Sequence, residues 1–217
     1  MNTLDYIKNK FNIKEEQSPI KLNISRFGQL PELFKELGFK TGAEVGVSKG
    51  RYSRALCEKI PDLKLYCVDP WKSYDEYVEL HDEAGQILLD SFLEITKERL
   101  APYNFEIVRK TSMKAVKDFE DSSLDFCFLD GNHTFEYIVN DIAEWSKKVK
   151  VGGIISGHDY WNSGKDVGWL SYEATEKEQM KLCQVKWAVD AYTNANKIAP
   201  WFITGRDKCP SFFWVKE

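Results

Sequence analysis

Apolar residues in the middle of the chain fall into short continuous runs, separated by segments with helical spacing. The runs that we expect to be strands cover residues 43–47, 63–68, 105–109, 124–129 and 153–156. Continuous apolar runs of this length are typical of strands buried on both faces. The helices expected between them cover residues 51–59, 74–100, 113–119 and 136–149. Strands that alternate with helices predict an α/β domain with a parallel, helix-covered sheet.

The two ends of the chain follow other patterns. Residues 1–25 are polar and mixed, which predicts an N-terminal helical extension before a single domain at 26–217. Near the other end, two short aromatic runs at 201–204 and 211–215 are joined by turn residues, which predicts a hairpin. The expected fold is therefore doubly wound, with a mostly parallel seven-stranded sheet and an antiparallel C-terminal hairpin. Residues 161–184 fit no core element, and we expect an insertion or lid there.

Composition excludes several classes of protein. The chain has 217 residues and a net charge of -4, so a broad nucleic-acid-binding face is disfavoured. No apolar run approaches the roughly 20 residues of a membrane helix, and the first residues contain no apolar signal segment. The five cysteines include no C-x-x-C pair. Reduced thiols and a cytoplasmic location are the expectation.

The first strand runs into a glycine-containing turn. The sequence AEVGVSKG places Gly46 and Gly50 between a strand and a helix, and Asp69 ends the next strand. Glycines let the backbone approach a ligand, and an acid at this distance can accept both ribose hydroxyls. The blander interpretation is a packing turn, with Asp69 as a turn residue before Pro70. The third glycine of the pyrophosphate turn is absent, which disfavours a nicotinamide oxidoreductase and favours a nucleoside cofactor without phosphates, such as S-adenosylmethionine (SAM).

A second group of polar residues follows the fourth and fifth strands. Asp130 and His133 come after the fourth, and His158 and Asp159 come after the fifth. In open α/β sheets, ligands bind beyond the carboxyl ends of the strands. Two carboxylates and imidazole can hold a divalent cation. They can equally supply a general base and its orienting partner, and both interpretations stay open here.

Five motifs in order carry a family resemblance. The segments are AEVGVSKGRYSRAL, LYCVDPWKSY, DFCFLDGNHTFEYIVNDIAEW, VGGIISGHDY and QVKWAVDAY. They resemble the class I SAM-dependent methyltransferases, and more narrowly the branch related to catechol and sugar O-methyltransferases (methyltransferase family 24). The resemblance covers roughly residues 40–215 and implies the Rossmann-like methyltransferase fold.

The resemblance implies a set of cofactor contacts. The positions that match them are Glu44, Gly46, Gly50, Asp69, Ser112 and Asp130. Asp69 matches the ribose-binding acid, and Ser112 matches the adenine-contact position, although the acid common beside that position is missing. Trp71 can either flank the adenine or pack in the core. Ser112 can alternatively cap the helix that it precedes.

The resemblance also implies a reaction centre. Asp130 and Asp159 match metal-ligand positions of the metal-dependent members, which points to Mg²⁺ or another divalent cation, and His158 is a third candidate ligand. Tyr160 stands where those members carry Asn or Asp. The catalytic lysine of the catechol enzymes has no counterpart after Asp130. We therefore expect His133 to be the base, with Asp130 and His158 as further catalytic residues.

The leading hypothesis is O-methylation of a hydroxyl on a small molecule, such as a sugar or a phenol, without membrane partners. A nucleic-acid methyltransferase is less favoured, because D-G-N-H-T-F stands where the N/D-P-P-Y/F motif would lie. A non-catalytic SAM-binding or scaffold protein is another alternative, and a homodimer stays open. Asp141, on the helix after Asp130, is expected on a solvated face.

Overall fold

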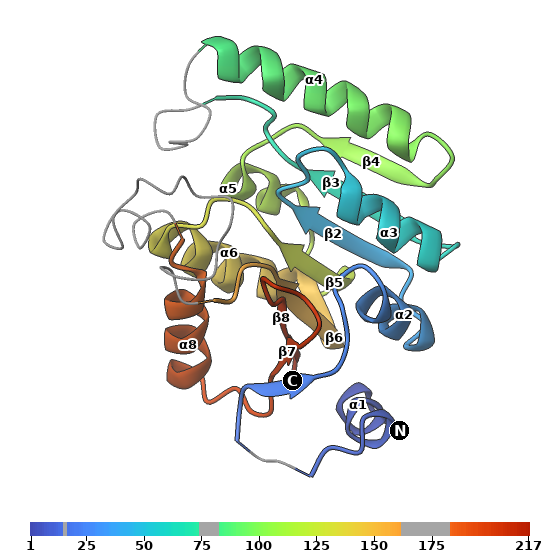
Figure 1. Ribbon diagram of the computed structural model, residues 1–217, viewed down its shortest axis with the longest axis vertical. Coiled ribbons are helices and arrows are strands. Elements are labelled where there is room, and N and C mark those ends of the chain that lie inside the picture. The colour runs from blue at the N-terminus through green and yellow to red at the C-terminus, as the bar shows by residue number, and fades with distance from the viewer. Residues whose placement is uncertain (15–16, 74–82, 162–182) are drawn as a thin grey trace.

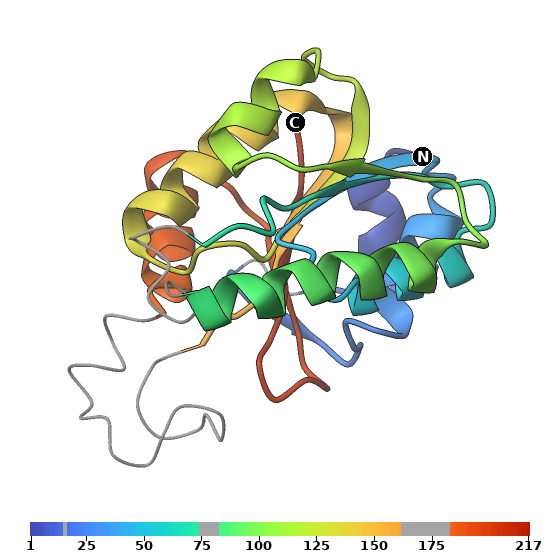
Figure 2. The same cartoon turned by 90° about the horizontal axis from the view of Figure 1, so that it is seen from above.

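The computed structural model describes residues 1–14, 17–73, 83–161 and 183–217, and these residues form one sheet with helices on both faces (Figures 1 and 2). The strands are β1 (Ile20–Leu22), β2 (Thr41–Val45), β3 (Lys64–Val68), β4 (Phe105–Val108), β5 (Leu124–Leu129), β6 (Val149–Gly157), β7 (Phe202–Thr204) and β8 (Phe212–Val215). In the described part of the chain the sheet has 8 strands in the order β1-β7-β8-β6-β5-β2-β3-β4.

Strand pairing confirms the predicted doubly wound, mostly parallel sheet. Strand β8 runs antiparallel between β6 and β7, and the other pairs are parallel. Strand β1 is the eighth strand and was not expected from the sequence. It pairs with β7, so the blue N-terminal strand lies beside the red C-terminal hairpin in Figure 1. The alternation of buried and exposed residues in β1 covers only Ile20, Lys21 and Leu22, of which Lys21 is exposed. A pattern of three residues is too short to be detected in a sequence.

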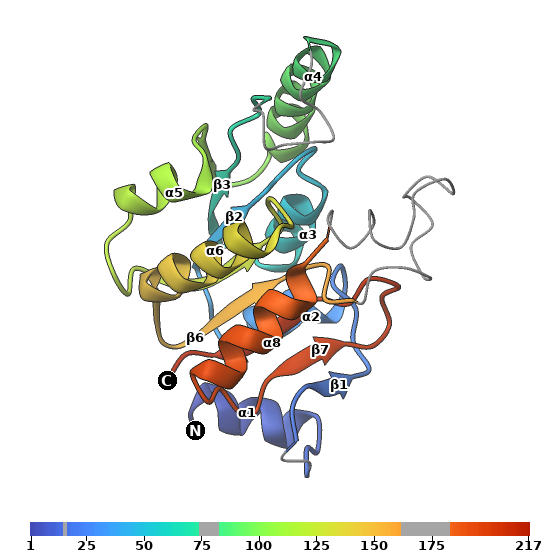
Figure 3. The same ribbon diagram turned by 90° about the vertical axis from the view of Figure 1, so that its left-hand side faces the viewer.

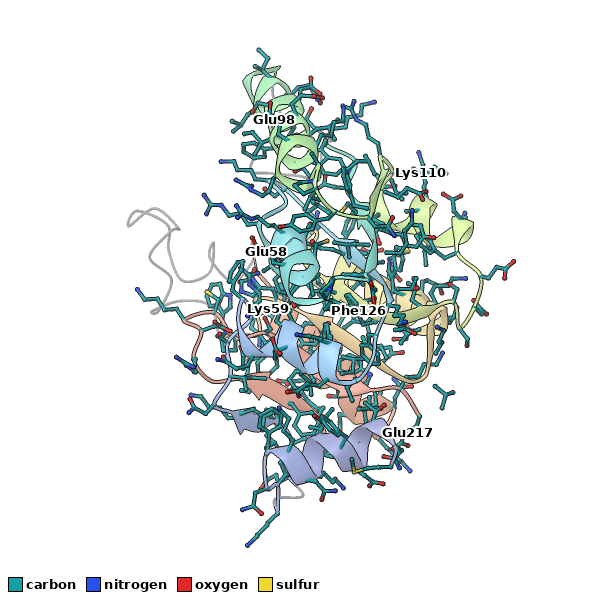
Figure 4. The ribbon with its side chains drawn as sticks, turned by 90° about the vertical axis from the view of Figure 1, so that its right-hand side faces the viewer. Glu58, Lys59, Glu98, Lys110, Phe126 and Glu217 are labelled. Atoms are coloured by element: carbon teal, nitrogen blue, oxygen red, sulfur yellow. The ribbon has the colours of Figure 1, made fainter. Side chains whose placement is uncertain are left out.

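Helices cover both faces of the sheet. Helices α1 (Thr3–Lys10), α2 (Gln29–Glu36), α3 (Arg51–Lys59) and α4 (Glu83–Leu100) lie on the face turned to the viewer in Figure 4. Helices α5 (Ser112–Ala115), α6 (Phe135–Lys148) and α8 (Val185–Ala195) lie on the face shown in Figure 3, and the 3₁₀ turn Val116–Asp118 follows α5. Among the described helices, none combines the length and the apolar character that a membrane crossing requires.

Each face has its own hydrophobic core. Phe126 anchors the core under α1–α4, and Trp145 anchors the core under α5, α6 and α8; both side chains are fully buried. Figure 4 shows Phe126 in the interior, whereas Glu58, Glu98 and Lys110 point outward. Burial on both faces explains why the central strands read as continuous apolar runs.

The agreement with the sequence prediction is closest for α3 and β5, whose bounds match the expected ones. The five cysteines are free thiols, as expected, and Cys67 and Cys127 are buried in strands. Residues 74–82 of the predicted long helix and 162–182 of the predicted insertion or lid lie outside the described residues. The division into an extension at 1–25 and a domain at 26–217 stays a prediction.

The central parallel strands end in register. Val45 pairs with Val68 on one side and with Leu129 on the other, and Leu129 pairs with Gly157. The residues that follow these positions along one edge of the sheet are Gly46, Asp69, Asp130 and His158. The fold therefore brings both groups of candidate residues to the same edge, beyond the carboxyl ends of β2, β3, β5 and β6 (Figure 1).

Candidate active site

The loop between β2 and α3 requires glycine where it meets the next strand. Gly46 has a φ of 89°, and a Cβ atom there would lie 2.0 Å from the backbone oxygen of Asp130. Gly50 precedes α3 with a φ of 67°. Both conformations favour glycine. The loop can therefore pass directly over the end of β5.

Asp69 organises this loop from the end of β3. One of its carboxylate oxygens accepts the backbone N–H groups of Val47 at 3.0 Å and Ser48 at 2.9 Å. The other accepts the backbone N–H of Trp71 at 2.7 Å. Burial raises the pKa of Asp69, although these three hydrogen bonds oppose the shift. A carboxylate has about four lone-pair sites, so the group can still accept a ligand hydroxyl.

Trp71 has a structural position behind the loop. Its side chain is fully buried, and its indole N–H donates to the backbone oxygen of Ser48 at 2.8 Å. Thr96 of α4 donates to the same oxygen at 2.9 Å. These contacts fix the loop conformation from the side of α4. They support the packing interpretation of Trp71.

A cavity of about 700 Å³ opens beside the loop. Its walls come from the ends of β2, β3 and β5, the start of α5 and the first turns of α6. They include Gly46, Ser48, Asp69, Pro70, Thr111, Ser112, Met113, Asp130, Gly131, Asn132, Tyr137, Asn140 and Asp141. The predicted cofactor residues Gly46, Asp69, Ser112 and Asp130 thus line one cavity. Glu44, Gly50 and Trp71 stand behind its walls.

Glu44 lies under the loop rather than in the cavity. Its side chain is buried in β2, and its carboxyl group accepts a hydrogen bond from the Ser53 hydroxyl of α3. Burial raises the pKa of Glu44 to about 8, against the lowering effect of Ser53. Glu44 therefore links β2 to α3 as a largely neutral acid at pH 7.

Asp141 departs from its expected position. The sequence predicts a solvated face for this residue, but its side chain is buried at 3% exposure and lines the cavity. Ser112 donates to its carboxyl group and accepts the indole N–H of Trp145 at 2.8 Å. Burial raises the pKa of Asp141 to about 7. The prediction was wrong because a charged residue in an amphipathic helix is normally expected on the exposed face. The hydroxyl group that pairs with Asp141 belongs to Ser112 of α5, and the sequence of α6 does not reveal this contact.

The acidic–histidine cluster consists of Asp130, His133, His158 and Asp159, and its members meet next to this cavity. His133 Nε2 lies 3.3 Å from Asp159 Oδ2 and 3.5 Å from Asp130 Oδ1. His158 Nδ1 lies 3.1 Å from Asp159 Oδ1 and 3.6 Å from Asp130 Oδ1. Asp159 has a φ of 58°, which is uncommon outside glycine. The four residues that the sequence predicts for the reaction centre are thus in mutual contact.

The charges in the cluster support one another. Burial acts to raise the pKa of Asp130, but His158, His133 and Arg26 outweigh it and hold that pKa well below its usual range. Burial acts to lower the pKa of His158, but Asp130 and Asp159 outweigh it and raise the pKa to about 9. His158 is therefore an imidazolium at neutral pH and cannot accept a proton there.

Arg26 is a member of the site that sequence reasoning missed. Its guanidinium Nη1 lies 3.0 Å from Asp130 Oδ2, and both side chains are mostly buried. The residue follows β1 and reaches Asp130 across 104 positions of sequence. No local motif marks it. Only the pairing of β1 with β7 brings it to the edge of the sheet.

The fit of a divalent cation can be tested on these contacts. Donor atoms of Asp130, His133 and Asp159 lie within 4.8 Å of one another, whereas the predicted set contained His158 in place of His133. Mg²⁺ prefers an octahedron of oxygen ligands, and an imidazole in the set suits a transition metal better. Arg26 already occupies one oxygen of Asp130. The arrangement therefore does not fit Mg²⁺.

Comparison with known families agrees with this architecture. The family described as methyltransferase domain (methyltransferase family 24) matches residues 43–160, which is more than half of the chain. The chain belongs to this family. A protein of Sinorhizobium fredii, the uncharacterized protein y4gI, is 27% identical over 122 residues, which is 54% of this chain but only 12% of that protein.

Solved structures share the fold across nearly the whole chain. A protein of Staphylococcus aureus, provisionally assigned as a caffeoyl-CoA O-methyltransferase, is 12% identical with a TM-score of 0.63, covering 99% of this chain and 90% of its own. The O-methyltransferase TomG of Streptomyces achromogenes, in complex with SAM, is 16% identical with a TM-score of 0.60 and covers 99% and 90%. A Bacillus cereus O-methyltransferase, in complex with S-adenosylhomocysteine (SAH), is 13% identical with a TM-score of 0.59 and covers 99% and 89%.

The chain therefore carries a methyltransferase domain, as the sequence motifs predicted, and it has the fold of these O-methyltransferase structures.

Proposed function

We propose that the protein transfers the methyl group of SAM to a hydroxyl of a small molecule, with His133 as the base. The observation that carries the proposal is the position of Asp130. This residue lines the cofactor cavity and also contacts His133. A methyl donor bound in the cavity would therefore end beside the acidic–histidine cluster.

The cavity offers a partner for each part of the cofactor. Asp69 would accept the ribose hydroxyls, and the loop at Gly46 would admit the methionine part beside Asp130. The family pattern has an acid next to the position of Ser112, and this chain lacks it there. Asp141 would take its place and accept a hydrogen bond from the adenine amino group. Glu44 and Trp71 were predicted as cofactor contacts as well. Their burial behind the cavity wall gives them supporting roles.

The reaction is an in-line substitution. The acceptor oxygen forms a bond to the methyl carbon while the bond from that carbon to the sulfonium sulfur breaks, so SAH leaves with the electron pair. His133 takes the proton of the acceptor hydroxyl. Holding the oxygen and the methyl group in line supplies much of the rate, and a positioned base typically contributes about 10²–10⁴-fold.

His158 and Asp159 would orient the base. Asp159 faces Nε2 of His133 with one oxygen and Nδ1 of His158 with the other, at 3.3 and 3.1 Å. Two carboxylates that face Nε2 would fix the orientation of the His133 ring. His158, protonated at neutral pH, would act as a positioning residue through Asp159.

A small hydroxylated acceptor is supported by the structural neighbours and by the net charge of the chain. The structural neighbours from Bacillus cereus and Streptomyces achromogenes are named as O-methyltransferases, and the latter is involved in tomaymycin synthesis. The net charge of -4 disfavours a polyanionic acceptor such as a nucleic acid. We propose a sugar or phenolic hydroxyl as the acceptor group.

The test is methyl transfer from isotope-labelled SAM to a panel of sugars and phenols, followed by mass spectrometry. We expect a product that has gained one labelled methyl group on oxygen. His133→Gln should lose this product while still binding SAH in calorimetric titration. Binding of SAH without transfer to any hydroxylated acceptor would instead support the non-catalytic alternative, and transfer to nitrogen or carbon would contradict the proposed acceptor class.

A further inference from the structure

Arg26 reaches the acidic–histidine cluster from the N-terminal segment. Its guanidinium Nη1 lies 3.0 Å from Asp130 Oδ2, with 17% and 20% of the two side chains exposed. A charge-assisted hydrogen bond of this kind is among the stronger polar contacts in proteins. The contact uses an oxygen of Asp130, a carboxylate that belongs both to the cavity wall and to the cluster.

The backbone around Arg26 is fixed on two sides. Its own N–H donates to Asp207 Oδ2 at 2.7 Å, in the turn between β7 and β8. Arg206 donates to the backbone oxygen of Ile24 at 3.1 Å, and Gly205 donates to that of Leu22 at 2.7 Å. These bonds continue the pairing of β1 with β7 past the end of the strands. The segment that carries Arg26 is thus tied to the sheet.

The side chain of Arg26 is also held by aromatic rings. Its guanidinium carbon lies 4.6 Å from the ring centroid of Phe27 and 5.6 Å from that of Tyr52. A planar guanidinium packs well against such rings, and its fixed geometry means that less freedom is lost when it pairs. Arg26 is therefore pre-positioned on Asp130 rather than drawn from a mobile surface side chain.

A divalent ion would compete with this arrangement. Donor atoms of Asp130, His133 and Asp159 lie within 4.8 Å of one another, so an ion bound there would stand next to the guanidinium. Like charges at such distances repel strongly in a partly buried site. An ion that took both oxygens of Asp130 would also break the pair with Arg26 and leave a buried cation without its partner.

We propose that Arg26 is a built-in cation of this site, which neutralises Asp130 and keeps divalent ions out of the space between Asp130, His133 and Asp159. Arg26 acts on the reaction through Asp130 and is a positioning residue. The effect of Arg26 on catalysis rests on the proposed function, whereas the exclusion of metal ions does not. The exclusion of metal can be measured without acceptor or cofactor.

The first experiment is a titration of the wild-type protein and variants with Mn²⁺, followed by electron paramagnetic resonance of the free ion. We expect weak binding to the wild type and an affinity at least about tenfold higher in Arg26→Met. Arg26→Lys keeps a positive charge and should gain less. The double variant Arg26→Met with Asp130→Asn should lose the gain, because it removes a ligand. Arg54→Met, which removes an exposed Arg–Glu pair on α3, is the matched control and should bind as the wild type does.

Two outcomes overturn the proposal. One is wild-type binding of Mn²⁺ as tight as that of Arg26→Met. The other is an absence of gain in a folded Arg26→Met, as judged by thermal unfolding. Should this variant not fold, Asp207→Ala replaces it, because it removes the acceptor of the Arg26 backbone N–H. Asp207→Ala should then show a smaller gain of the same sign, and no gain there counts against the proposal. A parallel SAH titration separates this result from a failure of the proposed function.

Discussion

Two kinds of carboxyl group lie at the same edge of the sheet, and their pKa values are shifted in opposite directions. Burial raises the pKa of Glu44 to about 8 and that of Asp141 to about 7. Asp130 is mostly buried, with 20% of its side chain exposed, but its pKa lies well below the usual range. The first two receive hydrogen bonds from serine hydroxyls, whereas Asp130 contacts Arg26 and lies near His158.

The contrast shows that the partner decides the charge of a carboxyl group that burial alone would neutralise. Hydroxyl partners cannot offset the loss of hydration, so Glu44 and Asp141 hold protons near neutral pH. Cationic partners more than offset it at Asp130. Glu44 behind the cavity wall and Asp141 in the wall therefore bind protons near neutral pH, whereas Asp130, which lines the same cavity and belongs to the acidic–histidine cluster, stays ionised.

The largest effect should come from a change in the acidic–histidine cluster. His133→Ala removes the proposed base, and we expect kcat to fall by about 10²–10⁴-fold, the usual contribution of a positioned base. The affinity for SAH should not change, because His133 stands outside the cofactor cavity. Steady-state kinetics with labelled SAM and calorimetry with SAH measure the two quantities. Full turnover in this variant would remove His133 from the reaction.

The difference in protonation between Glu44 and Asp130 can be tested by the pH dependence of the free energy of unfolding. The pKa of Glu44 is raised in the folded state, so its stabilising effect is full below about pH 4.5 and is lost as pH rises through 8. Glu44→Gln has no such dependence. Between pH 5 and pH 8 we expect the unfolding free energy of the wild type, relative to Glu44→Gln, to fall by about 3 kcal/mol.

Urea denaturation at several pH values measures this difference. Asp130→Asn should show the opposite sign, because the pKa of Asp130 is lowered: its stabilising effect is present above about pH 4 and is lost as pH falls. Glu106→Gln, at an exposed position paired with Lys64, is the control and should show little dependence. Parallel curves for Glu44→Gln and the wild type would refute the neutral state of Glu44.

The cofactor cavity is tested by Asp69→Ala. The change removes the proposed ribose acceptor and the partner of three loop N–H groups, so SAH should bind about 100-fold more weakly. Asp121→Ala, which removes an exposed pair with Lys148, should leave SAH binding unchanged. Calorimetric titration decides the matter, and equal affinity in Asp69→Ala would place the ribose elsewhere.

The smallest effect concerns the adenine end. If the Asp141 carboxyl accepts the adenine amino group, the wild type should prefer SAH over S-inosylhomocysteine, which has an oxygen there, by about tenfold. Asp141→Leu should bind the two with similar affinity. Because the ratio is measured within one variant, a general loss of binding does not disturb it. An unchanged preference would contradict the role of Asp141.

The sequence predicted which residues gather at this edge of the sheet but missed some of their partners, and the reason is distance along the chain. Gly46 and Asp69 lie within a single strand–helix–strand unit, so local spacing is enough to bring them together. Asp130 and Asp159 follow neighbouring strands, so the parallel order could also be predicted. Arg26 depends on a three-residue strand that pairs with β7, and Asp141 depends on Ser112 across two elements. Such contacts leave no periodic pattern.

The pairing of β1 with β7 also has a consequence for the order of folding. Ile20 pairs with Phe202, so this contact spans nearly the whole described chain and closes one of its longest loops. Contacts of such high sequence separation carry a large loop-closure entropy. During synthesis, Arg26 can be anchored only after β7 and Asp207 have left the ribosome, because its backbone is tied to the turn that follows β7. The pair of Arg26 with Asp130 thus forms only once the two ends of the chain have met.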